Sequence, residues 1–438
     1  MTKVLLVESR PSGRQSAIAH KLESHGHEVF IASRSGAVQT GMLVGESIFS
    51  TKNAQAFFEK LVAAVEKIKP DLIVPSSEDI LDAGIADVFR QRGYPVFGPS
   101  LEAMWLEASK VDAKKAMNNA GVPTADYRTF QTAGEYEALR YVKDHFAVYP
   151  HKPLVIKRKG LAYAQGVRVC HTPQEANGAL HRYMRAQGDS VVVEEYLDGD
   201  ERSMHAFCDG TNYYTVPFFM RDYKWSHEGD QGDLTGSMAT VARAPHPGLP
   251  WTPVIGEKII GRMFDYLKWR GISPIGCLYP GLKVGEYGLW RVLEYNWRFG
   301  DSECQVMCAL LRSDLFSLMY ACAVGRLSEA VIEWHPGHAV CINLVSRGYP
   351  GTPQTGFPIS GLEEASQVEG VTLHWAGMQQ GLNKLLTAGG RVISIVAWAL
   401  RLEDAISNAY LAAELVKYEG KRYRGDIGAD VLMLNGPT

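Results

Sequence analysis

Short apolar runs alternate with helical patterns over the first hundred residues, and this alternation restricts the possible folds more than any other feature of the chain. Residues 3–7 (KVLLV) form a nearly continuous apolar run, as in a parallel strand buried on both faces. A helical pattern follows at about residues 15–24. Further strand-like segments, with helical patterns between them, lie at residues 27–33, 71–75 and 94–98. Strands that alternate with helices predict a doubly wound α/β unit.

Beyond this unit the pattern changes. We expect one helix over residues 101–120, ended by a glycine and a proline within residues 121–124. Strands rich in β-branched residues then continue to about residue 325. Within them, residues 221–239 are polar and lack an apolar pattern, which predicts a long structureless loop that is either functional or a disordered surface insertion. The last hundred residues hold short strands and one helix near residues 402–418, which predicts a small α/β cap.

Charge and composition favour small-molecule chemistry. The chain has 45 basic and 48 acidic residues and a net charge of −3, so nothing predicts a nucleic-acid or membrane surface. No apolar run reaches the roughly 18 residues of a membrane-spanning helix, and the amino terminus lacks the apolar segment of a signal peptide. Seven scattered cysteines, without metal-binding or redox spacing, indicate buried thiols in a reducing cytoplasm.

A lysine at a strand end, followed by a glycine-containing loop, is the first candidate site. Lys157 ends the segment LVIK, and Gly160 and Gly166 follow it. A lysine in this position can meet nucleotide phosphates while backbone N–H groups close over them. A surface hairpin with a solvated lysine has the same pattern, so this feature alone does not identify a phosphate site.

The segment VVVEEYLDGDE has the composition of an adenine slot. Its three valines lead into two carboxylates, Glu194 and Glu195, and then into Tyr196 and Leu197. The backbone after Glu194 can pair with the edge of the base while the tyrosine and leucine pack against its face. Glu201 is placed to accept hydrogen bonds from ribose hydroxyls. An ordinary strand end with solvated acids is the competing interpretation.

The segment RVLEYNWRFGDSECQ is the strongest candidate. Glu294 and Asn296 alternate along a strand, so their side chains lie on one face. Two oxygen donors on one face are suited to magnesium, which completes its shell with waters and nucleotide phosphates. Arg298 continues this face and can bind a carboxylate or phosphoryl group with two hydrogen bonds. A plain core strand would not carry three polar groups in this order.

Together and in this order, these segments resemble the ATP-grasp superfamily, and most closely the phosphoribosylamine–glycine ligase (glycinamide ribonucleotide synthetase) family of purine biosynthesis. The resemblance runs nearly end to end through FGPS with EASK, GVPTADY, VVVEEYLDGDE, DYK, LEYNWRFGDSECQV, RGYPG, AGGRV and RGDIG. It implies an α/β ATP-grasp fold. The expected domains are an N-terminal α/β substrate domain (1–102), a linker helix with a flap subdomain (103–190), a catalytic core (191–326) and a C-terminal cap (327–438).

The resemblance also implies roles for individual residues. ATP contacts are expected from Lys110, Lys157, Glu194, Glu195, Tyr196, Leu197 and Glu201; magnesium ligands from Glu294 and Asn296; catalytic groups from Asp222, Lys224, Arg298 and Asp301; and substrate contacts from Gly13, Arg14 and Glu78. The implied cofactors are ATP and Mg²⁺, with Mn²⁺ as an alternative ion. The implied partners are an amine and a carboxylate, in a monomer or homodimer. The implied reaction activates the carboxylate as an acyl phosphate, which the amine then attacks, so the protein mainly positions groups and neutralises charge.

Several loops depart from the family pattern. Gly13 and Arg14 are kept at the predicted start of a helix, where a helix N-terminus beside a guanidinium is suited to phosphate. Gln15 and Ser16, however, stand where the family has Glu and His. The flap loop has Gln165 in place of a lysine, and PNTGGMGA becomes DLTGSMAT. The loops expected to hold the ribosylamine and to close over the acyl phosphate have therefore diverged.

Three functions remain open from the sequence. The first is glycinamide ribonucleotide synthesis from phosphoribosylamine, glycine and ATP. The second is the same ligation with another amine or amino acid in a specialised pathway, which the acidic segment PSSED favours because an added acid would repel a phosphate. The third is a nucleotide-binding protein without catalysis, against which Glu294, Asn296, Arg298 and Asp301 argue. Residues 221–239 are expected to cover the acceptor site.

Overall fold

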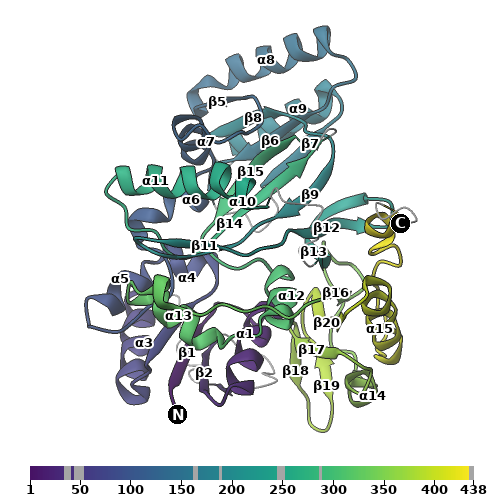
Figure 1. The fold of residues 1–438 in the computed structure, drawn as a ribbon. Coiled ribbons are helices and arrows are strands. Elements are labelled where there is room, and N and C mark those ends of the chain that lie inside the picture. The colour runs from purple at the N-terminus through teal and green to yellow at the C-terminus, as the bar shows by residue number, and fades with distance from the viewer. Residues whose placement is uncertain are drawn as a thin grey trace.

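The protein is a mixed α/β structure built on two four-stranded sheets and one ten-stranded sheet (Figure 1). The computed structural model describes residues 1–33, 41–43, 54–160, 166–186, 190–243, 252–285 and 289–433. Among the helices in these ranges, none is both long and apolar enough to span a membrane.

The amino-terminal unit contains the predicted parallel sheet flanked by helices. Its strand order is β3-β2-β1-β4. The strands are β1 (Lys3–Val7), β2 (Glu28–Ala32), β3 (Met42–Leu43) and β4 (Leu72–Pro75), and the helices are α1 (Gly13–Ser24), α3 (Ala54–Ile68), α4 (Glu78–Asp82) and α5 (Ile85–Arg90). Residues 94–98 form no full strand, because only Val96 bridges to Ile73. The carboxyl ends of β1 and β4 meet at one edge, so the segments after them lie side by side.

The single helix predicted over residues 101–120 is wrong in detail. This stretch forms a short 3₁₀ turn (Leu101–Ala103), α6 (Trp105–Ala108) and α7 (Lys110–Asn119). The break falls at Ser109, whose extended backbone leaves the helical region and whose hydroxyl accepts a hydrogen bond from Asp112 N at 3.3 Å. A serine N-cap thus starts a new helix inside the helical pattern.

A second four-stranded sheet forms the flap at the top of Figure 1. Its order is β5-β8-β6-β7. The strands are β5 (Tyr127–Phe130), β6 (Leu154–Arg158), β7 (Val167–Cys170) and β8 (Val191–Glu195), and the helices are α8 (Glu135–Val148) and α9 (Pro173–Leu180). Apolar residues of both helices and of the strands form one buried cluster. Residues 161–165 of the predicted glycine loop lie outside the described residues.

The ten-stranded sheet joins the central and carboxyl-terminal parts of the chain. Its order is β11-β10-β14-β9-β12-β13-β16-β20-β17, with β15 paired to β14. The strands are β9 (Asp200–Ser203), β10 (Ala206–Asp209), β11 (Tyr213–Thr215), β12 (Met220–His227), β13 (Gln231–Arg243), β14 (Ile275–Val284), β15 (Trp290–Asn296), β16 (His338–Val345), β17 (Val371–Trp375) and β20 (Arg391–Ala399). The remaining elements are α10 (Thr252–Gly256), α11 (Arg262–Trp269), α12 (Glu303–Leu310), α13 (Leu315–Ala323), α14 (Leu362–Ser366), the β18 (Met378–Gln380) and β19 (Leu385–Thr387) pair, α15 (Leu402–Leu415) and α16 (Ala429–Met433).

This sheet crosses one of the predicted domain boundaries. Strand β13 pairs with β16 from Ala239–Ile342 to Arg243–His338, so the carboxyl-terminal strands extend the central sheet. Strand β8, at the start of the predicted core, pairs with β5 and β6 of the flap. The three boundaries between the four predicted domains remain predictions.

The prediction of a structureless loop at residues 221–239 is wrong, because these residues form the hairpin of β12 and β13. The ladder is regular from Met220–Ala242 to Tyr223–Ala239 and then shifts register, since the next pair is Trp225–Leu234. The extra residues of β13 form a bulge, which breaks the alternation that identifies a strand in a sequence. Polar residues in this stretch point into a cleft, so the lack of an apolar pattern does not reflect an irregular backbone.

Candidate active site

A cleft of about 540 Å³ lies between the amino-terminal unit, the flap, the ten-stranded sheet and the carboxyl-terminal strands. Fifteen of the sixteen predicted site residues line it, and only Gly13 does not. Gly13 starts α1 directly behind the cleft, where a Cβ would come within 2.5 Å of Gln305 Nε2 and Ser394 Oγ. A side chain at this position would therefore have to displace the side chains of Gln305 and Ser394. The structure brings the predicted residues together, and their individual roles remain predictions.

The end of the cleft that is predicted to bind phosphates has two buried lysines on one carboxylate. Lys114 Nζ lies 2.6 Å from Glu194 Oε2, and Lys157 Nζ pairs with the other oxygen of Glu194. Lys114 also donates to Thr124 Oγ1 at 2.6 Å. Burial lowers the pKa of Lys114 to about 8 against the opposing effect of Glu194. Sequence reasoning missed Lys114, although it follows Lys110 by four residues and so lies on the same face of α7.

The Glu194 side chain therefore points toward the lysines. In this segment, the groups that remain for contact with a base are the backbone after Glu194 and the side chains of Tyr196 and Leu197. Both side chains line the cleft. Glu195 instead accepts hydrogen bonds from Arg291 Nη1 at 2.8 Å and from Asp126 N at 3.0 Å. These contacts fix the strand end where the predicted adenine slot begins.

Lys224 and Glu201 form the ion pair at the predicted ribose end. Lys224 Nζ lies 2.6 Å from Glu201 and 3.7 Å from Asp222. Burial and the neighbouring Glu303 carboxylate raise the pKa of Asp222 well above its usual range. Glu303, which sequence reasoning missed, accepts a hydrogen bond from Tyr279 Oη at 2.7 Å. Glu303 lies within the recognised segment RVLEYNWRFGDSECQ, but its burial at the start of α12 has no sequence signal.

The strand β15 places Glu294 and Asn296 on one face, as predicted, and both line the cleft. Burial alone would raise the pKa of Glu294, but Lys224 and three further cations lower it to about 2. The carboxylate is therefore ionised at neutral pH. Asn296 donates its amide N–H to Tyr279 O at 3.3 Å, which leaves the amide oxygen available. This pair of hard oxygen donors fits Mg²⁺.

Metal binding at this strand would also need a nucleotide. Within the described ranges, no three His, Cys, Asp or Glu side chains gather as a metal site of their own. Two protein oxygens leave most of the octahedral shell of Mg²⁺ to phosphates and water. The donor set therefore fits a magnesium ion that enters with ATP.

At the opposite end of the cleft, Arg298 lies between two carboxylates. Its Nε is 3.0 Å from Glu78 Oε2 and 3.2 Å from Glu107 Oε1. Glu107 also accepts a hydrogen bond from Trp297 N at 2.8 Å, which fixes it beside the strand end. The motif EASK contains Glu107, but only the fold brings it next to residue 298. The Arg298 guanidinium is thus oriented before any substrate arrives.

Arg14 is also paired, with a residue that the sequence did not single out. Its Nη2 lies 2.6 Å from Glu8 Oε1, and its Nη1 donates to Phe299 O at 2.9 Å. Ser12 and Ser76 donate hydrogen bonds to the same carboxylate at 2.9 and 3.0 Å. As predicted, the guanidinium lies at the start of α1, but Glu8 already neutralises it.

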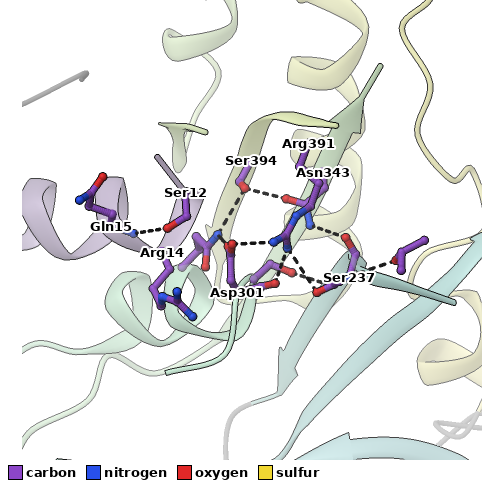
Figure 2. A network of polar contacts seen from close by, with 12 residues as sticks. Ser12, Arg14, Gln15, Ser237, Asp301, Asn343, Arg391 and Ser394 are labelled. Carbon is purple, nitrogen blue, oxygen red and sulfur yellow. Dashed lines mark hydrogen bonds and ion pairs between the residues drawn. The ribbon is translucent and has the colours of Figure 1, made fainter. Parts of the chain in front are cut away.

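Asp301 meets an arginine from the carboxyl-terminal strands (Figure 2). Arg391 Nη2 lies 2.8 Å from Asp301 Oδ2, and Gln305 Nε2 donates to the other oxygen at 2.6 Å. Arg391 also donates to the carbonyl of Gly236 at 3.3 Å, so it links β20 to the bulge of β13. Sequence reasoning quoted AGGRV but did not assign Arg391 to the site.

Hydroxyl and amide groups form hydrogen bonds beside this corner of the cleft (Figure 2). Ser394 Oγ donates to Asn343 Oδ1 at 2.6 Å, and Asn343 Nδ2 donates to Ser237 O at 3.1 Å. Ser237 has a φ of 134°, a region that favours glycine, and its hydroxyl lies 2.9 Å from Ser302 Oγ. These hydrogen bonds hold a strained bulge residue beside Arg391.

Family models match the chain in three consecutive parts. They are the phosphoribosylglycinamide synthetase N domain at residues 2–107, its ATP-grasp (A) domain at residues 108–304 and its C domain at residues 339–430. The crystal structure of the phosphoribosylamine–glycine ligase of Thermotoga maritima superposes with a TM-score of 0.78 at 28% identity, covering 97% of this chain and 100% of that one. A biotin carboxylase of Campylobacter jejuni, at 17% identity and a TM-score of 0.68 over 96% and 93% of the two chains, shares the fold.

Curated relatives extend the match over the whole length. The phosphoribosylamine–glycine ligase of Caldanaerobacter subterraneus subsp. tengcongensis is 37% identical over 432 residues, which cover 98% of this chain and 99% of that one. The ligase of Chlorobaculum tepidum is 34% identical over 435 residues, covering 98% and 100%. The predicted ATP-grasp fold is confirmed, and the chain belongs to the phosphoribosylamine–glycine ligase family of ATP-dependent ligases that form carbon–nitrogen bonds.

Proposed function

We propose that this protein joins glycine to phosphoribosylamine with ATP, forming glycinamide ribonucleotide, ADP and phosphate. The observation that carries the proposal is that the residues predicted to bind phosphate, metal and carboxylate line one cleft, in a chain that matches the family over nearly its full length. ATP is proposed to lie between the lysine end and the EEYL segment. Oligomeric state, use of Mn²⁺ and a cytoplasmic location remain predictions.

The charges of the cleft support this assignment of its two ends. Lys110, Lys114 and Lys157 line the end proposed for the phosphates. Mg²⁺ held by Glu294 and Asn296 would neutralise charge on the phosphates when bound. With these roles, we expect the transferable phosphate near the middle of the cleft, within reach of a carboxylate held at the opposite end.

Arg298 and Arg391 are proposed to orient the amino-acid carboxylate for attack on the phosphate. A guanidinium can hold a carboxylate or phosphoryl group with two parallel hydrogen bonds. Both arginines have protein carboxylates as partners in the absence of substrate, so the substrate carboxylate would exchange with, or share, these contacts. The side chains mainly position groups and offset charge, as expected for phosphoryl and acyl transfer.

The test is ligation by the purified protein with Mg·ATP, glycine and freshly prepared phosphoribosylamine. ADP release that requires both acceptor and glycine, with a product of the mass of glycinamide ribonucleotide, is the expected result. No release with this pair, but release with another amine or amino acid from a panel, would contradict the substrate assignment. No release with any pair would favour the non-catalytic alternative.

The ion pair of Arg14 with Glu8 specifically favours the alternative of an acceptor without phosphate. A phosphate at the start of α1 must compete with a carboxylate 2.6 Å from the guanidinium. If the acceptor carries a phosphate, Arg14→Ala should raise its KM strongly, leave the KM for ATP nearly unchanged and abolish competition by inorganic phosphate. Glu8→Gln should lower the KM for the same acceptor. An unchanged KM for the acceptor in both variants would contradict the proposal that the acceptor carries a phosphate.

A further inference from the structure

The outer part of the β12–β13 hairpin carries cleft residues but is only loosely joined to the sheet. We define the hairpin tip as residues 225–234, beyond the bulge where Trp225 pairs with Leu234. Both of these residues line the cleft, as does the adjacent Lys224. A second register shift lies between Trp225 and His227. Because the ladder is interrupted on the sheet side, the placement of the tip depends on contacts from elsewhere.

Those contacts come from the carboxyl-terminal segment 424–430, which we call the C-terminal clamp. Arg424, only 2% exposed, lies 2.8 Å from Asp230 through Nη1 and donates to Trp225 O at 3.1 Å. Its other nitrogens bind Asp426, whose second oxygen accepts a hydrogen bond from Gly229 N at 2.9 Å. The clamp therefore binds both the side chain and the backbone of the tip.

A second arginine ties the same tip to the predicted nucleotide end. Arg221 lies 3.3 Å from Asp230, 3.4 Å from Asp200 and 3.2 Å from Asp430. Asp200 precedes Glu201, the partner of Lys224. The guanidinium carbons of Arg221 and Arg424 lie 5.0 and 5.2 Å from the ring centre of Tyr223, so this ring packs against both cations.

We propose that Arg424 is a positioning residue for nucleotide binding. Through Asp230 and the Trp225 carbonyl it holds the hairpin tip, and with it Lys224, against the nucleotide end of the cleft. Arg424 does not itself line the cleft, so its effect passes through the tip. The inference rests on the proposed function only in taking ATP as the ligand at that end.

Loss of Arg424 should weaken the apparent affinity for ATP although it removes no side chain that lines the cleft. If the tip is correctly placed about one-tenth of the time in Arg424→Ala, the KM for ATP rises about tenfold while kcat changes less than about twofold. Arg424→Lys should give an intermediate KM, because it keeps a charge near Asp230 but loses the planar fork that binds Asp426. Lys421→Ala is the matched control: the Lys421 ammonium donates at 2.7 Å to the Ala413 and Val416 carbonyls and to no residue of the tip.

The experiment measures KM for ATP, kcat, and the Tm of each variant with and without Mg·ATP. Support requires a higher KM and a smaller ATP-induced rise in Tm at sub-saturating ATP for Arg424→Ala, with Lys421→Ala like the wild type. A variant with lower Tm but unchanged KM and unchanged ATP response would overturn the proposal, as would a loss confined to kcat. If the wild type binds ATP but does not ligate glycine, the proposed function fails while the Tm measurement still decides the role of Arg424.

Discussion

The charge on Glu294 offers a quantitative test of the metal strand. Replacing Glu294 by Gln keeps the size of the side chain and mimics its protonated form. The pKa of this carboxyl is lowered from 4.5 to about 2 in the folded protein. Because one pKa unit is worth about 1.4 kcal/mol, the ionised group contributes about 3 kcal/mol to the free energy of unfolding at neutral pH.

The pH dependence follows from the direction of this shift. A carboxyl whose pKa is lowered by folding contributes its full stability above the unfolded value of 4.5 and loses it as the pH falls toward 2. Glu294→Gln should therefore lower the Tm at pH 7, and the difference from the wild type should shrink as the pH drops below about 4.5. A surface change at Glu333, which pairs with Arg312 at 3.8 Å, should leave the Tm unaltered and serves as the control.

Catalysis should respond differently from ATP binding. Without a charged metal ligand, turnover with Mg·ATP should fall by about a hundredfold or more, as for loss of a major electrostatic contact. Stabilisation by ATP without Mg²⁺ should be kept or increased, because the carboxylate no longer repels the phosphates. ADP release with a normal Mg²⁺ dependence would remove the metal assignment. A Tm difference that does not change with pH would refute the charge argument.

Two further predictions concern residues that sequence reasoning missed. The pKa of Lys114 is lowered from 10.5 in the unfolded chain to about 8 in the folded protein. Between pH 8 and 10.5 the unfolded chain therefore binds more protons than the folded one. The free-energy cost of burying the Lys114 cation disappears as the pH rises through this range. Any gain in Tm of Lys114→Met over the wild type should accordingly decline from pH 8 to pH 10; a constant difference would contradict the assignment. Arg391→Ala should lower both the Tm and kcat, because it leaves the buried Asp301 without its cation, at a cost of about 3–5 kcal/mol. Unchanged glycine kinetics in a folded Arg391→Ala protein would remove Arg391 from the proposed carboxylate site.

The sequence predicted those parts of the site that lie on one continuous segment. Glu294, Asn296 and Arg298 share a face because a strand alternates its side chains with a period of two, and this can be read without knowing the fold. The amino-terminal sheet was predictable for a similar reason, since buried parallel strands are short continuous apolar runs. Strand alternation and apolar runs were sufficient to predict a site residue or strand wherever the whole pattern lay within a few consecutive residues.

Groups brought together by tertiary structure had no such signal. Glu107 and Arg298 are far apart in the sequence, and their 3.2 Å contact depends on how α6 packs against β15. The hairpin at residues 221–239 was missed because its bulge and its cleft-facing polar side chains interrupt the period of two. Its outer part also depends on contacts from the C-terminal clamp, which no local pattern records.

Several of the missed residues share one physical property, which is that they balance the charges of residues that were found. Glu8 pairs with Arg14, Glu107 with Arg298 and Arg391 with Asp301, so the carboxylate end of the cleft is built from ion pairs. Burying a lone cation or anion is costly, so the buried charges of this cleft are stabilised by partners of opposite charge. We therefore expect a substrate carboxylate or phosphate at this end to exchange with, or share the cation of, a protein carboxylate. Selectivity at this end depends on which ion pair opens, and this is why substitutions at Glu8 and at Arg14 should change the KM for a phosphorylated acceptor in opposite directions.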